Sequence, residues 1–193
     1  MIAIIDYGVG NLFSLKSSLN ALGFDNIVTC EAQKIANSSH VILPGVGAFG
    51  DAAEKLRARG LDAAVLDAAR RGQPLLGICL GMQLLFEESL EFGTHRGLGL
   101  LPGKVIPLRD DVGDKTLKIP HMGWNSLENS GAYVYYVHSF YVPRGACTLD
   151  WSKYGDAAVS GVVGRENVRG TQFHPEKSGE AGLKMLKNFC EVR

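Results

Sequence analysis

A cysteine flanked by two glycines is the residue of this sequence best suited to chemistry. Cys79 follows the apolar residues 74–78, with Gly77 two residues before it and Gly81 two residues after it. This pattern is the cysteine form of the G-x-S-x-G nucleophile elbow, in which a strand turns sharply into a helix and exposes the nucleophile. The glycines allow a close approach of strand and helix, and the helix N-terminus favours the reactive thiolate. The alternative is a small buried structural cysteine, since free cysteines are often buried.

A candidate base and its orienting group stand together near the end of the chain, in Gln172-Phe-His-Pro-Glu176. A cysteine nucleophile needs a base within hydrogen-bond reach and a third group that orients the base. In an extended chain, residues two apart point to the same side, so the side chains of His174 and Glu176 would lie on one side of the segment. Pro175 between them suits a strand end. The spacing therefore predicts a Cys79–His174–Glu176 catalytic triad.

A glycine-rich loop could complete such a site. The apolar residues 41–43 lead into Pro44-Gly-Val-Gly47. Acyl transfer needs N–H donors aimed at the developing oxyanion. We expect one donor to be the N–H of Leu80 and the other to come from the loop at Gly47, where Gly45 and Gly47 permit unusual backbone angles. Taken alone, the loop is equally typical of an ordinary strand-to-helix turn.

Together these three motifs resemble the class I (triad) glutamine amidotransferases, and the resemblance covers essentially the whole chain. It implies that glutamine is the substrate and that no metal or organic cofactor is needed. It makes Gln83, one helical turn after Cys79, a contact for glutamine. It also implies that the backbone at Ser139 and Phe140 lines the glutamine site. The alternative for Gln83 is a solvated helix residue.

Three further strings resemble one branch of that family, whose members pass ammonia to a separate (β/α)8-barrel cyclase subunit in histidine biosynthesis. These strings are Ile4-Ile-Asp-Tyr-Gly-Val-Gly-Asn-Leu12, Pro120-His-Met-Gly-Trp-Asn125 and Val137-His-Ser-Phe-Tyr141. The branch implies a heterodimer whose products are imidazole glycerol phosphate and an aminoimidazole carboxamide ribotide. Two alternatives stay open: a glutaminase subunit of another amidotransferase, such as pyridoxal phosphate synthase, and a non-catalytic subunit that senses glutamine.

The motif positions also suggest a docking face for the partner. Candidate residues are Asn11, Trp124, Tyr135 and Lys177, on the same face as Cys79. Tryptophan and tyrosine are residue types that anchor interfaces. The alternative is that both aromatic residues are buried in the core. Because free glutamine hydrolysis would waste ammonia, we expect the loop at Gly47 to become fully productive only when the partner binds.

Length and composition set the class of protein. We expect a single domain over residues 1–193, and its 46% hydrophobic and 21% charged residues are ordinary for a globular protein. A net charge of zero gives no electrostatic case for nucleic acid or an anionic membrane. The four cysteines form no C-x-x-C pair, which argues against a zinc site or a disulfide framework. No signal peptide or long apolar span is recognisable, so we expect a cytoplasmic protein.

The pattern of elements predicts an α/β fold. Strands at 2–5, 27–29, 41–43 and 75–78 alternate with helices from 12 and from 61, which indicates a mostly parallel central sheet flanked by helices. Such sheets bind ligands at the carboxyl ends of their strands. Strands at 104–108, 118–120, 132–141, 157–163 and 168–173 have little helix between them, so we expect antiparallel additions to the sheet in the C-terminal half. A helix at 180–192 closes the chain.

Overall fold

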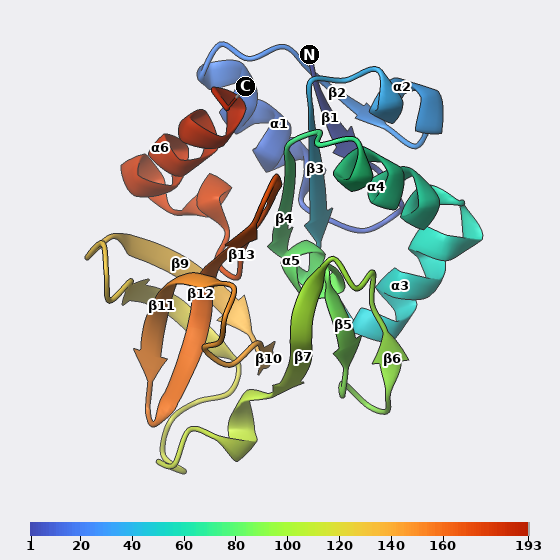
Figure 1. The fold of residues 1–193 in the computed structure, drawn as a ribbon. Helices are drawn as coiled ribbons and strands as arrows, with labels where there is room; N and C mark the ends of the chain where they lie inside the picture. The colour runs from blue at the N-terminus through green and yellow to red at the C-terminus, as the bar shows by residue number, and fades with distance from the viewer. Residues whose placement is uncertain (193) are drawn as a thin grey trace.

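A seven-stranded sheet forms the centre of the molecule in the computed structural model, which describes residues 1–192 (Figure 1). Its first strand along the chain, β1 (Ile2–Ile5), lies in the interior of the sheet and pairs in parallel with β2 (Asn26–Thr29) and β3 (His40–Gly45). Along the sheet the strands are β11 (Thr148–Tyr154), β12 (Ala157–Arg165), β13 (Val168–Thr171), β4 (Leu75–Cys79), β3 (His40–Gly45), β1 (Ile2–Ile5) and β2 (Asn26–Thr29). The run from β13 to β2 is parallel, and β11 and β12 add antiparallel strands at one edge.

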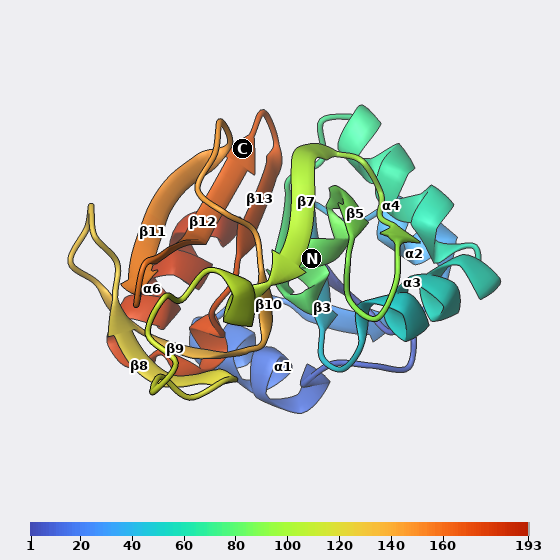
Figure 2. The same ribbon diagram turned by 90° about the horizontal axis from the view of Figure 1, so that it is seen from below.

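Helices cover both faces of this sheet (Figures 1 and 2). They are α1 (Leu12–Ala21), α2 (Ala32–Ala36), α3 (Phe49–Ala58), α4 (Leu61–Arg70), α5 (Leu80–Leu84) and α6 (Gly179–Cys190). Successive residues of β1 point to opposite faces, as a strand requires. Ile2 and Ile4 pack in the cluster that holds α1 and α6, whereas Ala3 and Ile5 pack with α2, α3 and α4. Burial on both faces explains the continuous apolar run of β1.

Two smaller sheets complete the fold. One has the order β10 (Phe140–Tyr141), β7 (Leu101–Pro107), β5 (Phe86–Ser89) and β6 (His95–Arg96). The other is the antiparallel pair β8 (His121–Ser126) and β9 (Tyr133–His138). Short 3₁₀ turns, η1 and η2, lie at Leu108–Asp110 and Pro175–Lys177. The predicted α/β class, with a mostly parallel sheet and antiparallel strands in the C-terminal half, is confirmed.

The expected placement of the later strands is partly wrong. The strand expected at 104–108 is β7, which pairs with β5 because Leu101 and Val105 pack in the same core as Phe86. The strand expected at 132–141 is broken at Ser139, where the chain passes from β9 to β10 in another sheet. Residues 118–120 form no strand, and β13 joins β4 in parallel.

Several local expectations also need correction. Asn11, a residue type that often caps a helix, directly precedes α1, and its side chain makes no capping hydrogen bond. The helices α2 and α3 and the strands β5, β6, β8 and β11 were not anticipated by the pattern. Within the described chain, no helix has the length and apolar character needed to cross a membrane.

Candidate active site

Cys79 occupies a sharp turn between β4 and α5. Its backbone has φ 55° and ψ −112°, a region that non-glycine residues seldom adopt. A Cβ on Gly81 would lie 1.8 Å from the Leu43 carbonyl oxygen, and one on Gly77 would lie 2.6 Å from the Gly81 carbonyl oxygen. Both glycines are therefore required because backbones approach closely on each side of the cysteine. Strand, strained residue and helix follow one another as the elbow pattern predicts.

The loop after β3 is held against this elbow. Gly45 pairs with Cys79 in the sheet, and a Cβ on Gly45 would lie 2.7 Å from Gly81 N. Its backbone is not in the positive-φ region, so close packing rather than an unusual angle explains this glycine; Gly47, by contrast, has φ 95°. The Tyr7 hydroxyl donates a 2.8 Å hydrogen bond to the Pro44 carbonyl. This contact gives the Asp-Tyr-Gly string near the N-terminus a structural role.

His174 and Glu176 form a buried pair. Their Nδ1 and Oε1 atoms lie 2.8 Å apart, and each side chain is 3% exposed. The expectation of an extended segment is wrong here, because His174 precedes the 3₁₀ turn η2, in which Pro175 is the first residue. The turn brings the two side chains together by local curvature. Its position is fixed by the His174 N–H, which donates to the Tyr135 carbonyl at 3.0 Å, and by the Ser178 hydroxyl, which donates to the His174 carbonyl at 2.6 Å.

The electrostatics of this pair favour a charged imidazole. Burial opposes protonation of the ring, but Cys79 and Glu176 together outweigh burial and hold the pKa of His174 well above its ordinary value. Cys79 raises this pKa most, and Glu176, whose Oε1 is hydrogen-bonded to Nδ1 of the ring, adds to the rise. An imidazolium beside Cys79 stabilises the thiolate, which is the nucleophilic form of cysteine.

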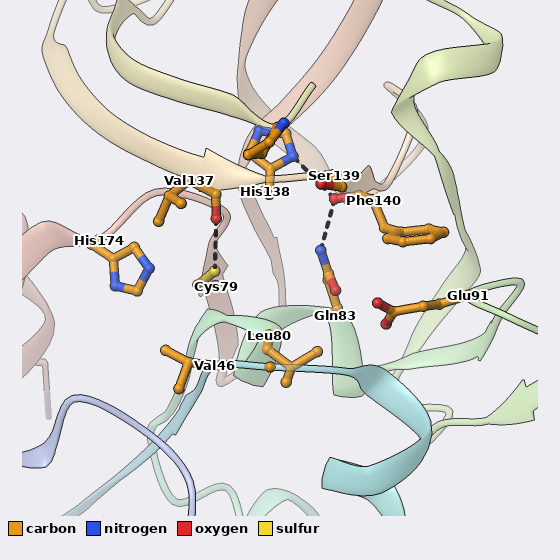
Figure 3. A pocket seen from close by; sticks show the side chains of 12 residues that line it. Val46, Cys79, Leu80, Gln83, Glu91, Val137, His138, Ser139, Phe140 and His174 are labelled. Atoms are coloured by element: carbon orange, nitrogen blue, oxygen red, sulfur yellow. Dashed lines mark hydrogen bonds between the residues drawn. The ribbon is translucent and has the colours of Figure 1, made fainter. Parts of the chain in front are cut away.

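Cys79, Gln83 and His174 line one pocket with a volume of about 400 Å³ (Figure 3). Other lining residues are Val46, Gly47, Leu80, Glu91, Pro120, Val137, His138, Ser139 and Phe140. The pocket thus brings together the predicted oxyanion donors Gly47 and Leu80 and the predicted glutamine contacts Gln83, Ser139 and Phe140. Its size lies within the range of small-molecule sites in proteins, about 300–1,000 Å³.

Gln83 is a buried part of the pocket and not a solvated helix residue. Its side chain is only 4% exposed, and Nε2 donates to the Phe140 carbonyl at 2.9 Å and to Gln172 Oε1 at 3.0 Å. Gln172 Nε2 in turn lies 3.8 Å from Cys79 Sγ, and Sγ lies 3.9 Å from the Val137 carbonyl oxygen. A hydrogen-bonded chain of side chains therefore joins α5 to the thiol.

Two residues of the site escaped the sequence analysis. Gln172 had a usable signal, since it stands two residues before His174 in the same motif. Glu91 had none, because it lies on the loop between β5 and β6, far from any motif. Burial raises the pKa of Glu91 against the opposing effect of the Phe49 N–H, which donates to Oε2 at 2.6 Å. Glu91 places a carboxylate in the pocket wall.

The remaining cysteines differ from Cys79 in position. All four are free; Cys30 is exposed, and Cys147 and Cys190 are buried. Burial raises the pKa of the Cys147 thiol and that of Cys190, which suppresses their thiolate forms. None of the three lines the pocket. In residues 1–192, no group of three or more His, Cys, Asp and Glu side chains is arranged to hold a metal ion.

Three of the four predicted docking residues gather at the surface near η2. Trp124 is 51% exposed, so the alternative that it is buried in the core is wrong. Its ring centroid lies 6.0 Å from that of Tyr135, and Lys177 Nζ lies 6.0 Å from the Tyr135 ring centroid. Asn11, at the start of α1, is partly exposed and takes no part in these aromatic contacts.

Comparison with known proteins decides the family. The model of the class-I glutamine amidotransferases matches residues 3–192. This chain belongs to that family. A protein of Bacillus cytotoxicus named imidazole glycerol phosphate synthase subunit HisH is 48% identical, covering 100% of this chain and 95% of the relative. A protein of the same name from Wolinella succinogenes is 47% identical and is covered in full, as is this chain.

Solved structures of amidotransferases share the fold. One described as a glutamine amidotransferase superposes with a TM-score of 0.77 over 100% of both chains, at 20% identity. The PurLQS structure from Thermotoga maritima gives a TM-score of 0.71 over 98% of this chain and 96% of the matched chain, at 21% identity. At such low identity, these similarities establish only the fold of this amidotransferase.

Proposed function

We propose that this amidotransferase hydrolyses L-glutamine to glutamate and ammonia with Cys79, His174 and Glu176, and supplies the ammonia to a separate cyclase subunit. One observation carries the glutaminase step. A cysteine held at positive φ lines the same pocket as a histidine whose Nδ1 is 2.8 Å from a buried carboxylate. That arrangement pairs a nucleophile with a base and an orienting group, as acyl transfer requires.

The chemistry proceeds through a thioester. The Cys79 thiolate attacks the side-chain amide carbon of glutamine, and the oxyanion forms beside the N–H groups of Leu80 and Gly47. His174 gives its Nε2 proton to the amide nitrogen, the C–N bond breaks, and ammonia leaves. A water then attacks the thioester carbonyl and loses a proton to His174. Collapse releases glutamate and the thiolate, while Glu176 keeps the ring in the Nδ1–H tautomer.

The pocket walls give a reason for glutamine as the substrate. The Glu91 carboxylate lines the pocket away from the reacting thiol and suits the α-ammonium of an amino acid. Gln83 and the backbone at Ser139 and Phe140 form the wall between Glu91 and Cys79, where a glutamine side chain would extend. The reaction needs no metal or organic cofactor by this route.

The partner and pathway rest on the relatives. The names of the similar proteins assign them to imidazole glycerol phosphate synthase, and this chain is covered in full by them. The proposed partner is therefore a (β/α)8-barrel cyclase that makes imidazole glycerol phosphate and the aminoimidazole carboxamide ribotide in histidine biosynthesis. The cyclase performs the lyase step. Asn11, Trp124, Tyr135 and Lys177 are the proposed docking residues, and the four free cysteines suit the reducing cytoplasm.

A glutaminase assay with purified proteins tests this function. We expect slow ammonia release by the chain alone and faster release after a stoichiometric amount of the cyclase is added. A glutaminase subunit of another amidotransferase, such as pyridoxal phosphate synthase, would respond to that synthase instead. A non-catalytic sensor would bind glutamine and release no ammonia with either partner, which would contradict the proposal.

A further inference from the structure

Two buried histidines lie opposite each other on β8 and β9 and have no role in the reaction described above. His121 and His138 are partners in the strand register, and they are 3% and 6% exposed. His121 Nδ1 and His138 Nε2 lie 3.0 Å apart. His138 reaches the wall of the glutamine pocket, where its ring lies beside Ser139 and Phe140 (Figure 3), whereas His121 does not line the pocket.

The hydrogen bonds of this pair have one possible direction. The Phe140 carbonyl can only accept, so His138 Nδ1, 3.0 Å away, carries a proton and donates it. In a neutral ring His138 Nε2 must then accept, and His121 Nδ1 must donate to it. His121 Nε2 is left as an acceptor for Asn125 Nδ2 at 3.4 Å. The Asn125 amide is oriented by the Ser126 N–H, which donates to Oδ1 at 2.8 Å.

The surroundings keep both rings neutral. Burial lowers the pKa of His121 to about 4. Burial, followed by the neighbouring His121 and by His174, lowers the pKa of His138 to about 3, against the opposing effect of the Phe140 carbonyl. His121 is also stacked between two rings, with centroid distances of 4.6 Å to Tyr136 and 4.0 Å to Tyr154. Protonation of either ring would remove an acceptor on which the direction of the chain depends.

The series of hydrogen bonds that runs through His121 and His138 ends at the Phe140 carbonyl in the glutamine pocket. The Phe140 carbonyl accepts one hydrogen bond from His138 Nδ1 and a second from Gln83 Nε2 at 2.9 Å. The neighbouring Ser139 carbonyl is already engaged by the Leu108 N–H at 2.9 Å. The Phe140 carbonyl belongs to β10, a two-residue edge strand in which Phe140 lies opposite Pro107 of β7, a residue with no N–H to donate to it. Its orientation therefore depends on the two side chains that donate to it.

We propose that His121 and His138 are positioning residues that hold the Phe140 carbonyl, and through it Gln83, in the geometry that binds glutamine. The proposal rests on the glutaminase function proposed above. Neither histidine touches the reacting atoms, so their loss should weaken glutamine binding and leave the chemical step largely intact.

Kinetics of the complex with the cyclase test this role. In His138→Phe the ring shape remains but the bond to the Phe140 carbonyl is lost, so KM for glutamine should rise about tenfold while kcat stays within about threefold. His138→Asn keeps an N–H close to the position of Nδ1 and should bring KM back to within about threefold of the wild type. His121 does not line the pocket, so His121→Phe should raise KM only by removing its hydrogen bond to His138.

His40→Phe is the matched control. His40 is also buried and hydrogen-bonded through both ring nitrogens, to Ser39 Oγ and the Val192 carbonyl, but it begins β3 at the edge of the sheet opposite Cys79. Its substitution should lower thermal stability and leave KM unchanged. An unchanged KM in folded His138→Phe or folded His121→Phe would overturn the positioning role, as would an equal rise in His40→Phe.

Nitrogen chemical shifts of the two histidine rings in the wild-type chain give an independent arm. Both rings should be neutral Nδ1–H tautomers at neutral pH. An Nε2–H tautomer at His138 would refute the proposed series of hydrogen bonds, whatever the activity. If the wild-type complex releases no ammonia from glutamine, the proposed function fails instead. The affinity of each variant for glutamine, measured by calorimetry, then decides the positioning role.

Discussion

Replacing Glu176 by glutamine removes the charge that faces His174 while leaving the size of the side chain almost unchanged. The Nδ1–Oε1 distance is 2.8 Å and both side chains are 3% exposed, so solvent screens this interaction little. A hydrogen bond to a charged group contributes about 1.5–3 kcal/mol. If this hydrogen bond stabilises the transition state in which His174 is charged, its loss in Glu176→Gln should lower kcat about 10- to 150-fold. Each 1.36 kcal/mol of activation free energy is a factor of ten in rate.

The assay is ammonia release at saturating glutamine by the complex with the cyclase, for wild type, Glu176→Gln and His174→Ala. His174→Ala removes the base itself and should lose on the order of 10⁴-fold or more. Thermal unfolding supplies the control. Because Glu176→Gln also removes the charge that faces the buried His174 imidazolium in the folded protein, the free energy of unfolding should fall, by up to about 3 kcal/mol.

Two outcomes would refute this reasoning. Wild-type kcat in Glu176→Gln would mean that the carboxylate supports the η2 turn and takes no part in the reaction. Activity as low as that of His174→Ala, with the fold intact, would mean that the carboxylate does more than orient and stabilise the ring.

Three other predictions follow from the same geometry. A glutamine-like electrophile should label Cys79 and abolish activity while leaving the other three cysteines unmodified, as mass spectrometry of the peptides will show. Trp124→Ala and Lys177→Ala together should weaken cyclase affinity in a titration, with unchanged circular dichroism; unchanged affinity would reject this docking face. The folded pKa of His121, about 4, lies below its unfolded value of about 6.5, so this residue contributes stability above pH 6.5 that is lost as the pH falls toward 4, on the order of 3 kcal/mol. Chemical denaturation between pH 7 and 4.5 should show this loss, with a flatter slope in His121→Phe.

The sequence predicted the parts of the fold that are specified locally. The apolar strand at residues 2–5 and the strand that leads to Cys79 were found because burial on both faces requires a continuous apolar run. The Cys79 elbow was found because its glycines are required by contacts with backbone only a few residues away or on the adjacent strand. These features leave a signal within a short window of sequence.

Features that depend on distant partners were missed. The pairing of β7 with β5 is set by shared packing around Phe86, and nothing within residues 101–107 distinguishes that partner from the central sheet. Glu91 enters the pocket through the path of a loop, so no spacing could have identified it. The His174–Glu176 contact was expected, but from an extended segment, because residues two apart can also be brought together by a 3₁₀ turn.

The order of strands in the central sheet explains why motifs so far apart in the sequence meet. β4 lies between β3 and β13 and is parallel to both, so the carboxyl ends of all three strands reach the same edge. Gly45 at the end of β3 pairs with Cys79, and Thr171 at the end of β13 pairs with Ile78. The glycine loop, the nucleophile and the base therefore leave adjacent strands at one level. Parallel pairing across β4 replaces a sequence separation of more than 90 residues by the spacing between neighbouring strands, about 4.8 Å. Any substitution that shifts β13 against β4 should therefore change the distance between nucleophile and base before it changes either residue's own environment.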